Sequence, residues 1–162
     1  MRMNNYASLI VAVALVGLVT ATHAASEITA HAAQEEKQSS VERKNYEAPT
    51  PPGRLFSQAV KHGNVLYVSG ITAIGTEAQG KSISEQARAI FSKLRAIAKA
   101  EGVDLSSLIK VTIFVTDMSQ AAELRQELSS QYSGQPPASS LIEVKSLFSP
   151  EANIEIEAII GL

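Results

Sequence analysis

The stretch NIEIEAII, residues 153–160, decides the fold, because its residues alternate between two kinds. One set is apolar and the other is mainly polar, which is typical of a β-strand that buries one face and exposes the other. Together with PASS at residues 137–140, this stretch predicts that the chain ends in sheet-forming segments. The apolar set is Ile154, Ile156, Ala158 and Ile160, and the opposite set is Asn153, Glu155, Glu157 and Ile159.

Further strands are predicted upstream by the same period of two. Apolar residues alternate at 65–69, a segment that ends at Gly70, and again at 109–116. A shorter strand is predicted near residues 140–144, directly after the PASS stretch. The chain therefore carries several strands that each have one apolar face.

Two helices are predicted between these strands. Residues 82–101 have apolar side chains at helical spacing, with Ser82 and Glu85 in a capping-box arrangement and Gly102 as the stop. A second helix starts at Asp117 or Ser119 and ends at Gly134. This order of elements predicts an α+β fold, in which a mixed sheet carries both helices on one face.

The N-terminal third differs from this domain in composition. Residues 1–24 have a basic start, a short apolar run and small residues at the end, which predicts a secretory signal peptide cleaved after Ala24. Cleavage after Ala32 is the second option, and a retained membrane anchor is the weaker one because the apolar run is short. Residues 25–52 are predicted to be a mobile polar leader, and residues 53–162 are predicted to be the domain. Folded chain is expected from about Asn45, near the end of this leader. The expected location is the periplasm or the medium, with no membrane contact after cleavage.

Composition excludes several functional classes. The formal charge of the 162-residue chain is -2, and removal of Arg2 with residues 1–24 changes it to -3 (13 Lys and Arg against 16 Asp and Glu). A mildly acidic chain does not favour nucleic acid as a partner. There is no Cys, and only His31 and His62 remain after residue 24, so we expect no metal site and no His-based catalysis.

Five segments in the right order resemble one known family. GRLFSQAV at 53–60 resembles G-P-Y-S-Q-A-V, and GNVLYVSG at 63–70 matches G-N-x-x-x-x-S-G. IKVTIFVTDM at 109–118 matches V-K-T-T-V-F-x-x-D-M. PASS and NIEIEAI resemble P-A-R-S and I-E-I-E-A-I. By these segments the chain is identified as a member of the reactive-intermediate deaminase family, called RidA or YjgF.

The resemblance implies a fold and a reaction. The fold would be that of the small chorismate mutase of bacilli, with three identical subunits around a central barrel and ligand clefts at their interfaces. The reaction would be hydrolysis of a small imine or enamine from metabolism to a carbonyl compound and ammonia, without a cofactor. Such a hydrolase acts on carbon–nitrogen double bonds and needs a carboxylate to orient or deprotonate water.

The site residues are carried over one at a time. Glu155 stands where the family has its catalytic carboxylate, although a solvated Glu on a sheet face, like Glu157, is the alternative. Ser69 matches a hydroxyl that lines the substrate cleft, and it is also an ordinary residue at a strand exit. Phe56 keeps the ring of the family's Tyr and loses its hydroxyl. Ser139 replaces the Arg that holds the substrate carboxylate.

The change at Ser139 leaves two functions open. A serine offers one rotatable hydroxyl where a guanidinium would form two charged hydrogen bonds, so capture of a carboxylate is weakened. Lys145 and Arg54 are basic residues nearby in the sequence, but their spacing gives no argument for a role in the site. The first hypothesis is a hydrolase for a less anionic imine. The second is a non-catalytic trimer that binds a metabolite or a protein, and a chaperone-like role is a third.

Overall fold

The computed structural model describes residues 40–46, 55–132 and 134–162. The predicted signal peptide and most of the predicted leader lie outside the described residues. The chain divides into two units, residues 1–40 and 41–162, and the elements below all belong to the second unit.

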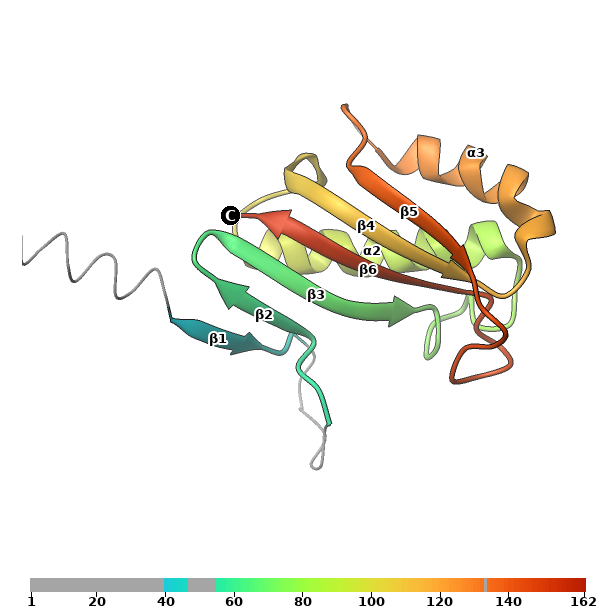
Figure 1. Ribbon diagram of the computed structural model, residues 1–162, viewed down its shortest axis with the longest axis horizontal. Coiled ribbons are helices and arrows are strands. Elements are labelled where there is room, and N and C mark those ends of the chain that lie inside the picture. Colours follow the sequence, from blue (N-terminus) through green and yellow to red (C-terminus); the bar gives the residue numbers. More distant parts are fainter. Residues whose placement is uncertain (1–39, 47–54, 133) are drawn as a thin grey trace, which may run out of the picture. The chain divides into compact units, whose positions relative to one another are not determined.

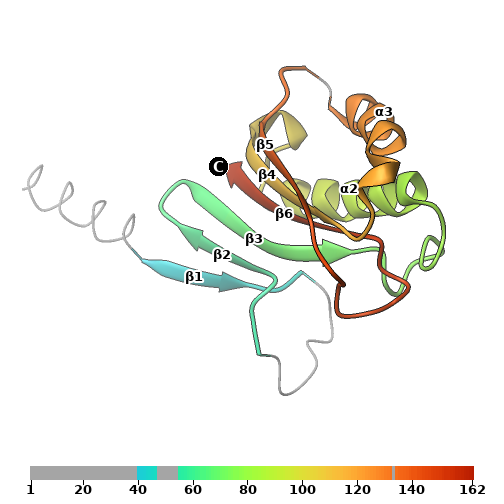
Figure 2. The same ribbon diagram turned by 45° about the vertical axis from the view of Figure 1, so that its right-hand side comes forward.

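A single six-stranded sheet organises this unit, in the order β1-β2-β3-β6-β4-β5 (Figures 1 and 2). All neighbouring strands are antiparallel except β4 and β5, which are parallel. The C-terminal strand β6 therefore lies at the centre, paired with β3 on one side and β4 on the other. The strands are β1 (Val41–Lys44), β2 (Ala59–His62), β3 (Val65–Thr72), β4 (Leu108–Val115), β5 (Ala138–Glu143) and β6 (Ile154–Gly161).

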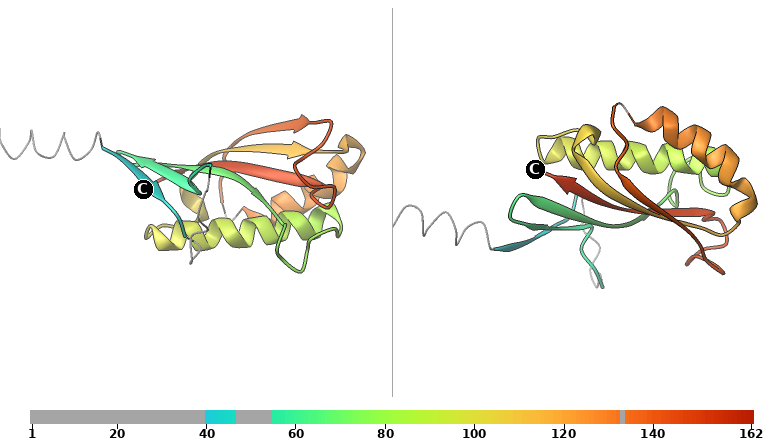
Figure 3. Two further views of the ribbon diagram at one scale, coloured as in Figure 1. Left: turned by 90° about the horizontal axis from the view of Figure 1, so that it is seen from below. Right: turned by 45° about the horizontal axis from the view of Figure 1, so that its top comes forward.

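Both helices pack on the same side of the sheet (Figure 3). The predicted capping box is present at the start of α2 (Ile83–Ala100), where Ser82 and Glu85 hold each other's backbone amides. The second helix begins later than predicted, because the turn η2 (Met118–Gln120), capped by the Asp117 side chain, precedes α3 (Ala121–Gln131). A second short turn, η1 (Leu105–Ser107), leads into β4. The predicted α+β class with two helices on one face is confirmed.

The core lies between the sheet and the helices. The apolar set of β6 is buried there, as its alternation predicts, and so are the apolar residues of β3, β4 and α2. Phe91 of α2 is fully buried and meets the ring of Tyr132 edge-on, with ring centroids 5.6 Å apart. No helix of the described part is long and apolar enough to span a bilayer. The largest fully buried side chains include Phe91, Leu66, Ile83, Ile90, Leu94, Ile113, Leu124, Ile154, Ile156 and Ile160.

Strand β1 lies within the stretch that the sequence predicts to be a mobile leader. It pairs antiparallel with β2, and the carboxylate of Glu101 at the end of α2 lies within 4 Å of Lys44 and Lys61. The same carboxylate accepts a hydrogen bond from the Tyr46 hydroxyl at 3.0 Å. Backbone pairing and charge hold this edge strand, and burial contributes little. The sequence VERK therefore lacks the alternation of apolar residues by which a strand is predicted.

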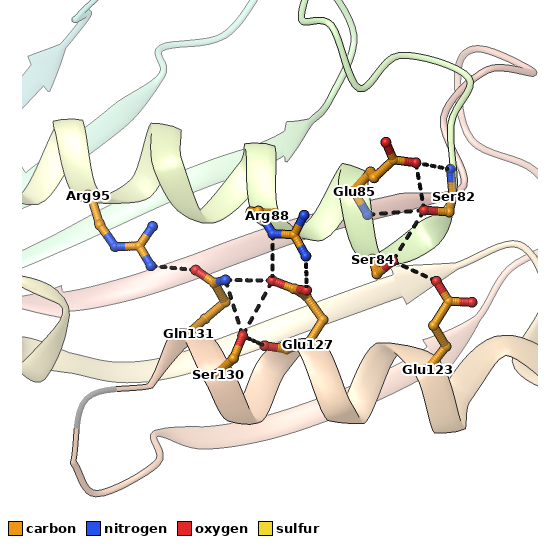
Figure 4. Close-up of polar contacts among 9 residues, drawn as sticks. All are labelled: Ser82, Ser84, Glu85, Arg88, Arg95, Glu123, Glu127, Ser130 and Gln131. Atoms are coloured by element: carbon orange, nitrogen blue, oxygen red, sulfur yellow. Dashed lines mark hydrogen bonds and ion pairs between the residues drawn. The ribbon is translucent and has the colours of Figure 1, made fainter.

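A buried polar cluster joins α2 to α3 (Figure 4). The Glu127 carboxylate is 8% exposed and accepts hydrogen bonds from Arg88 at 2.6 and 3.3 Å and from Gln131 at 2.6 Å. Burial alone would raise the pKa of Glu127, but the hydrogen bonds and the positive charge of Arg88 lower it below its usual value. The ionised carboxylate therefore stabilises the folded state.

Replacing Arg88 with Ala should lower the free energy of unfolding by about 1–2 kcal/mol at pH 7, because a buried carboxylate loses a charged partner that is itself exposed. A group with a lowered pKa stabilises the fold above its unfolded-state pKa, and this stability is lost as pH falls. The difference between wild type and Arg88→Ala should therefore shrink in acid, as measured by urea unfolding at pH 7 and pH 4. Lys99→Ala, on an exposed position of the same helix, is the control. An equal loss at both pH values would assign the effect to packing of the Arg88 stem.

Candidate functional site

Glu155 lies on the sheet face that points away from the helices. Its neighbours in β6, Ile154 and Ile156, are fully buried in the core on the other face. Across the sheet it pairs with Phe114 of β4 and Thr72 of β3. The carboxylate is therefore carried by the central strand, which is held on both sides.

The space that Glu155 occupies exists because residue 70 is glycine. A Cβ atom placed on Gly70 would lie 1.7 Å from Oε1 of Glu155, which is far inside a van der Waals contact. The register between β3 and β6 shifts between Val68 and Ile71, so that Gly70 sits at an irregularity of the strand. The carboxylate lies directly against this bare backbone.

The surroundings disfavour the charged form of Glu155. Burial raises the pKa of the Glu155 carboxyl, and the negative charge of Glu157 on the same face raises it further. Within the described ranges, neither a basic residue nor a hydrogen-bond donor contacts the carboxylate. A carboxylate of raised pKa without a counter-charge is suited to accept a proton from water in a reaction.

A cavity of about 360 Å³ lies between β3 and α2; Gly70 belongs to its lining and Glu155 does not. Ser69 and Phe56, both predicted to bind substrate, line it together with Gly70. The Ser69 hydroxyl donates a hydrogen bond to the carbonyl of Ser57 at 2.8 Å, so its oxygen remains free to accept one. Phe56 is 64% exposed and forms part of the mouth. The other lining residues are Tyr46, Gln58, Ile71, Thr72, Ile74, Lys93, Ala96, Ile97 and Phe148.

Ser139 lies elsewhere in the same chain. It is exposed on β5, where it pairs with Val111 of β4, and it lines a separate shallow hollow beside Arg125 of α3. Three steps across the sheet separate β5 from β3, which is about 14 Å at ~4.8 Å per strand. Within one chain, the structure brings Phe56, Ser69 and Glu155 toward Gly70 and leaves Ser139 apart.

The sequence did not single out Lys93 or Tyr46, which also line the cavity. Lys93 comes three residues after Ile90 and four before Ile97, at the flank of the buried face of α2. This spacing is the sequence feature that could have indicated its position at the edge of the core. Burial and a hydrogen bond to Glu101 raise the pKa of the Tyr46 hydroxyl, which therefore stays protonated. Among residues 40–46, 55–132 and 134–162, no group of three His, Cys, Asp or Glu side chains could hold a metal ion.

Comparisons with known proteins agree on one family. A family model described as endoribonuclease L-PSP matches residues 46–161. A RutC family protein of Sinorhizobium fredii is 38% identical over 117 residues, which cover 68% of this chain and 91% of the relative. The 2-iminobutanoate/2-iminopropanoate deaminase of Dermatophagoides farinae is 30% identical over 116 residues, 70% of this chain and 89% of the relative. The crystal structure of RidA from an Antarctic Psychrobacter matches with a TM-score of 0.63 and 30% identity over 74% of this chain and 98% of that one.

Replacing Gly70 with Ala should displace the Glu155 side chain, because the added Cβ would meet the end of a flexible side chain. The protein should stay folded, and the pKa of Glu155 should fall toward the usual glutamate value as the carboxylate moves into water. Carbon-13 NMR titration of the glutamate carboxyls would measure this shift. Gly161→Ala, where the nearest atoms to an added Cβ are 3.7 Å away, is the matched control. An unshifted Glu155 in Gly70→Ala would contradict the placement of the carboxylate.

Proposed function

We propose that this chain, which belongs to the reactive-intermediate deaminase (RidA, or YjgF) family, hydrolyses the carbon–nitrogen double bond of a small imine. The single observation that carries this proposal is the partly buried, unneutralised carboxylate of Glu155 against Gly70. Gly70 also lines the cavity to which Ser69 and Phe56 belong. Similarity to a 2-iminobutanoate/2-iminopropanoate deaminase supports the same class of reaction. The endoribonuclease description of the family model finds no support in a chain of net negative charge.

In the proposed reaction, water adds to the imine carbon while ionised Glu155 accepts one of its protons. Protonated Glu155 gives this proton to the imine nitrogen, which completes the carbinolamine. Glu155 then accepts the proton of the carbinolamine hydroxyl and passes it to the amino nitrogen as the carbon–nitrogen bond breaks and the carbonyl forms. One imine and one water thus give one carbonyl compound and one ammonia, and Glu155 is regenerated. An enamine substrate would first have to tautomerise to the imine.

The raised pKa of Glu155 matches this role. A base is most useful when its pKa lies close to the working pH, and burial moves the carboxyl in that direction. Because only the ionised form accepts a proton, kcat/KM should fall as pH decreases through this raised pKa.

We also propose that three copies associate through the open face of the sheet. Tyr67 and Ile142 lie on this face and are 47% and 41% exposed, and Phe114 and Ile159 between them are only partly buried. Association would cover this apolar surface. The family's interface cleft supports this arrangement, since the predicted site residues are divided within one chain.

A non-catalytic ligand-binding trimer is the second candidate. The substitution that favours it is Ser139, because no guanidinium is available there to hold a substrate carboxylate. This alternative and the hydrolase differ in what they require of Glu155.

Glu155→Gln separates the two candidates. If the protein is a hydrolase, the variant should lose about 10²-fold or more of the activity on imines generated in place by an amino-acid oxidase, assayed as release of ammonia or loss of the imine. Neutral imines should be tested in parallel, since Ser139 lacks a charge. Wild-type protein that does not accelerate hydrolysis of any imine would eliminate the enzymatic proposal.

The same variant has an internal control for folding. Because burial raises the pKa of Glu155, the wild type loses stability as pH rises from the unfolded-state pKa through the raised value. Glu155→Gln never acquires this charge, so its melting temperature should match or exceed that of wild type at neutral pH and converge with it in acid.

We further propose that the protein is exported and that residues 1–24 are removed. The full chain, expressed in a Gram-negative host, should be recovered from the periplasmic fraction with Ala25 at its N-terminus, or Ala33 if cleavage follows Ala32. N-terminal sequencing measures this directly. Full-length protein confined to the cytoplasm would refute export.

A further inference from the structure

A hollow of about 310 Å³ lies between α3 and the edge strand β5, at the opposite edge of the sheet from β1 (Figure 2). Three hydrogen-bonding side chains line it: Arg125 and Ser129 of α3 and Ser139 of β5. Arg125 and Ser129 are four residues apart, so both lie on the same side of α3. Ser139 shares a strand face with Leu141, which packs against the core, and therefore lies on the helix side of the sheet. Within one chain, this hollow shares no lining residue with the cavity between β3 and α2.

The guanidinium of Arg125 has no acidic partner within residues 40–46, 55–132 and 134–162. Both acidic residues of α3, Glu123 and Glu127, accept hydrogen bonds from side chains of α2 instead. The acidic residue of β5, Glu143, accepts a backbone N–H of η2 at 3.0 Å. Helix α3 thus has its acidic side chains toward α2 and its basic side chain toward β5, which leaves the hollow with a positive charge.

Three basic side chains of α2 that reach other elements have their donors engaged there. Lys93 donates hydrogen bonds to two backbone carbonyls at the end of β3 and in the loop after it, at 3.0 and 3.2 Å. Arg88 and Arg95 donate to side chains of α3. Arg125 also lies at a groove between two elements, yet none of its five N–H donors is used within the described part of the chain. A ligand in the hollow can therefore use all of them.

The rest of the wall is apolar. It consists of Leu128 and Tyr132 of α3 and the rings of Pro136 and Pro137, and the Tyr132 ring is held edge-on against the buried ring of Phe91. The Tyr132 hydroxyl is buried and has no hydrogen-bond partner in the described ranges. Burial raises the pKa of this hydroxyl, so it stays protonated and able to donate. Because a buried donor without an acceptor is unfavourable, an acceptor that reached it would gain affinity.

We propose that this hollow binds a small organic carboxylate, with Arg125 holding the anion, Ser129 and Ser139 adding hydrogen bonds, and the apolar wall receiving a short hydrocarbon chain. The volume is at the small end of the range for ligand sites, about 300–1,000 Å³, which limits this chain to a few carbons. The hollow lies apart from Glu155 within one chain, and the inference does not rest on the proposed hydrolysis.

The competing interpretation is that Arg125 is an exposed cation that attracts any anion weakly. Charge alone would attract inorganic phosphate at least as well as a carboxylate, whereas the apolar wall favours a ligand with a hydrocarbon chain. Pentanoate and pentanamide are matched probes, because they have nearly the same size and shape and differ in charge.

The test is an NMR chemical-shift titration of the nitrogen-15-labelled protein, full-length or processed, with pentanoate, pentanamide and inorganic phosphate at low salt. Pentanoate should shift signals of α3 and β5, and pentanamide and phosphate should bind more weakly there. Arg125→Gln should weaken binding of pentanoate by about 10-fold or more, the effect of a lost charged hydrogen bond. Arg43→Gln, at an exposed position of β1 on the opposite edge of the sheet, is the matched control and should bind like wild type.

Three results would each overturn the inference: equal binding of pentanoate by wild type and Arg125→Gln, phosphate binding as tight as that of pentanoate, or shifts confined to residues around Gly70 and Glu155. Because Arg125 is exposed, Arg125→Gln should melt at the wild-type temperature, which separates lost binding from lost folding. A protein that fails to hydrolyse any imine would leave the expected titration unchanged, so the two proposals fail independently.

Discussion

A partly buried carboxylate without a counter-charge is the constraint on which the site depends. Glu155 is fixed from behind by Ile154 and Ile156, whose burial prevents the strand from turning its other face outward. Gly70 leaves the room that the carboxylate occupies. The apolar core of the domain thus holds an unfavourable charge in position, and in the proposed reaction this charge accepts a proton from water.

The carboxylates of Glu127 in α3 and Glu155 in β6 show how neighbouring groups shift a pKa in opposite directions. Glu127 is the more buried by area, yet its pKa is lowered because Arg88 and Gln131 donate to it. Glu155 is less buried by area, and its pKa is raised by burial and, further, by the negative charge of Glu157. The first carboxylate stabilises the packing of two helices, whereas the second reduces stability at neutral pH. The difference between structural and reactive carboxylates therefore lies in the partners of each group.

Local patterns predicted much of the fold. The alternation in β6 and the capping box at Ser82 depend on neighbours within a few residues, and both proved reliable. Strand β1 was missed because an exposed edge strand has no apolar alternation. The distance between Ser139 and Ser69 could not be predicted, since it follows from the order of strands across the sheet. The contact of Lys93 with β3 was missed for the same reason, because helical spacing identifies a face and leaves its partner unknown.

The central place of β6 also governs when the domain can form. Strands β3 and β4 are both complete long before residues 154–161, which must lie between them, have been synthesised. A growing polypeptide on the ribosome consequently lacks the middle of this sheet until residues 154–161 emerge, and the contacts of β6 with β3 are of long sequence separation. Late completion of the sheet is compatible with the export proposed above, because a translocation channel accepts an unfolded polypeptide.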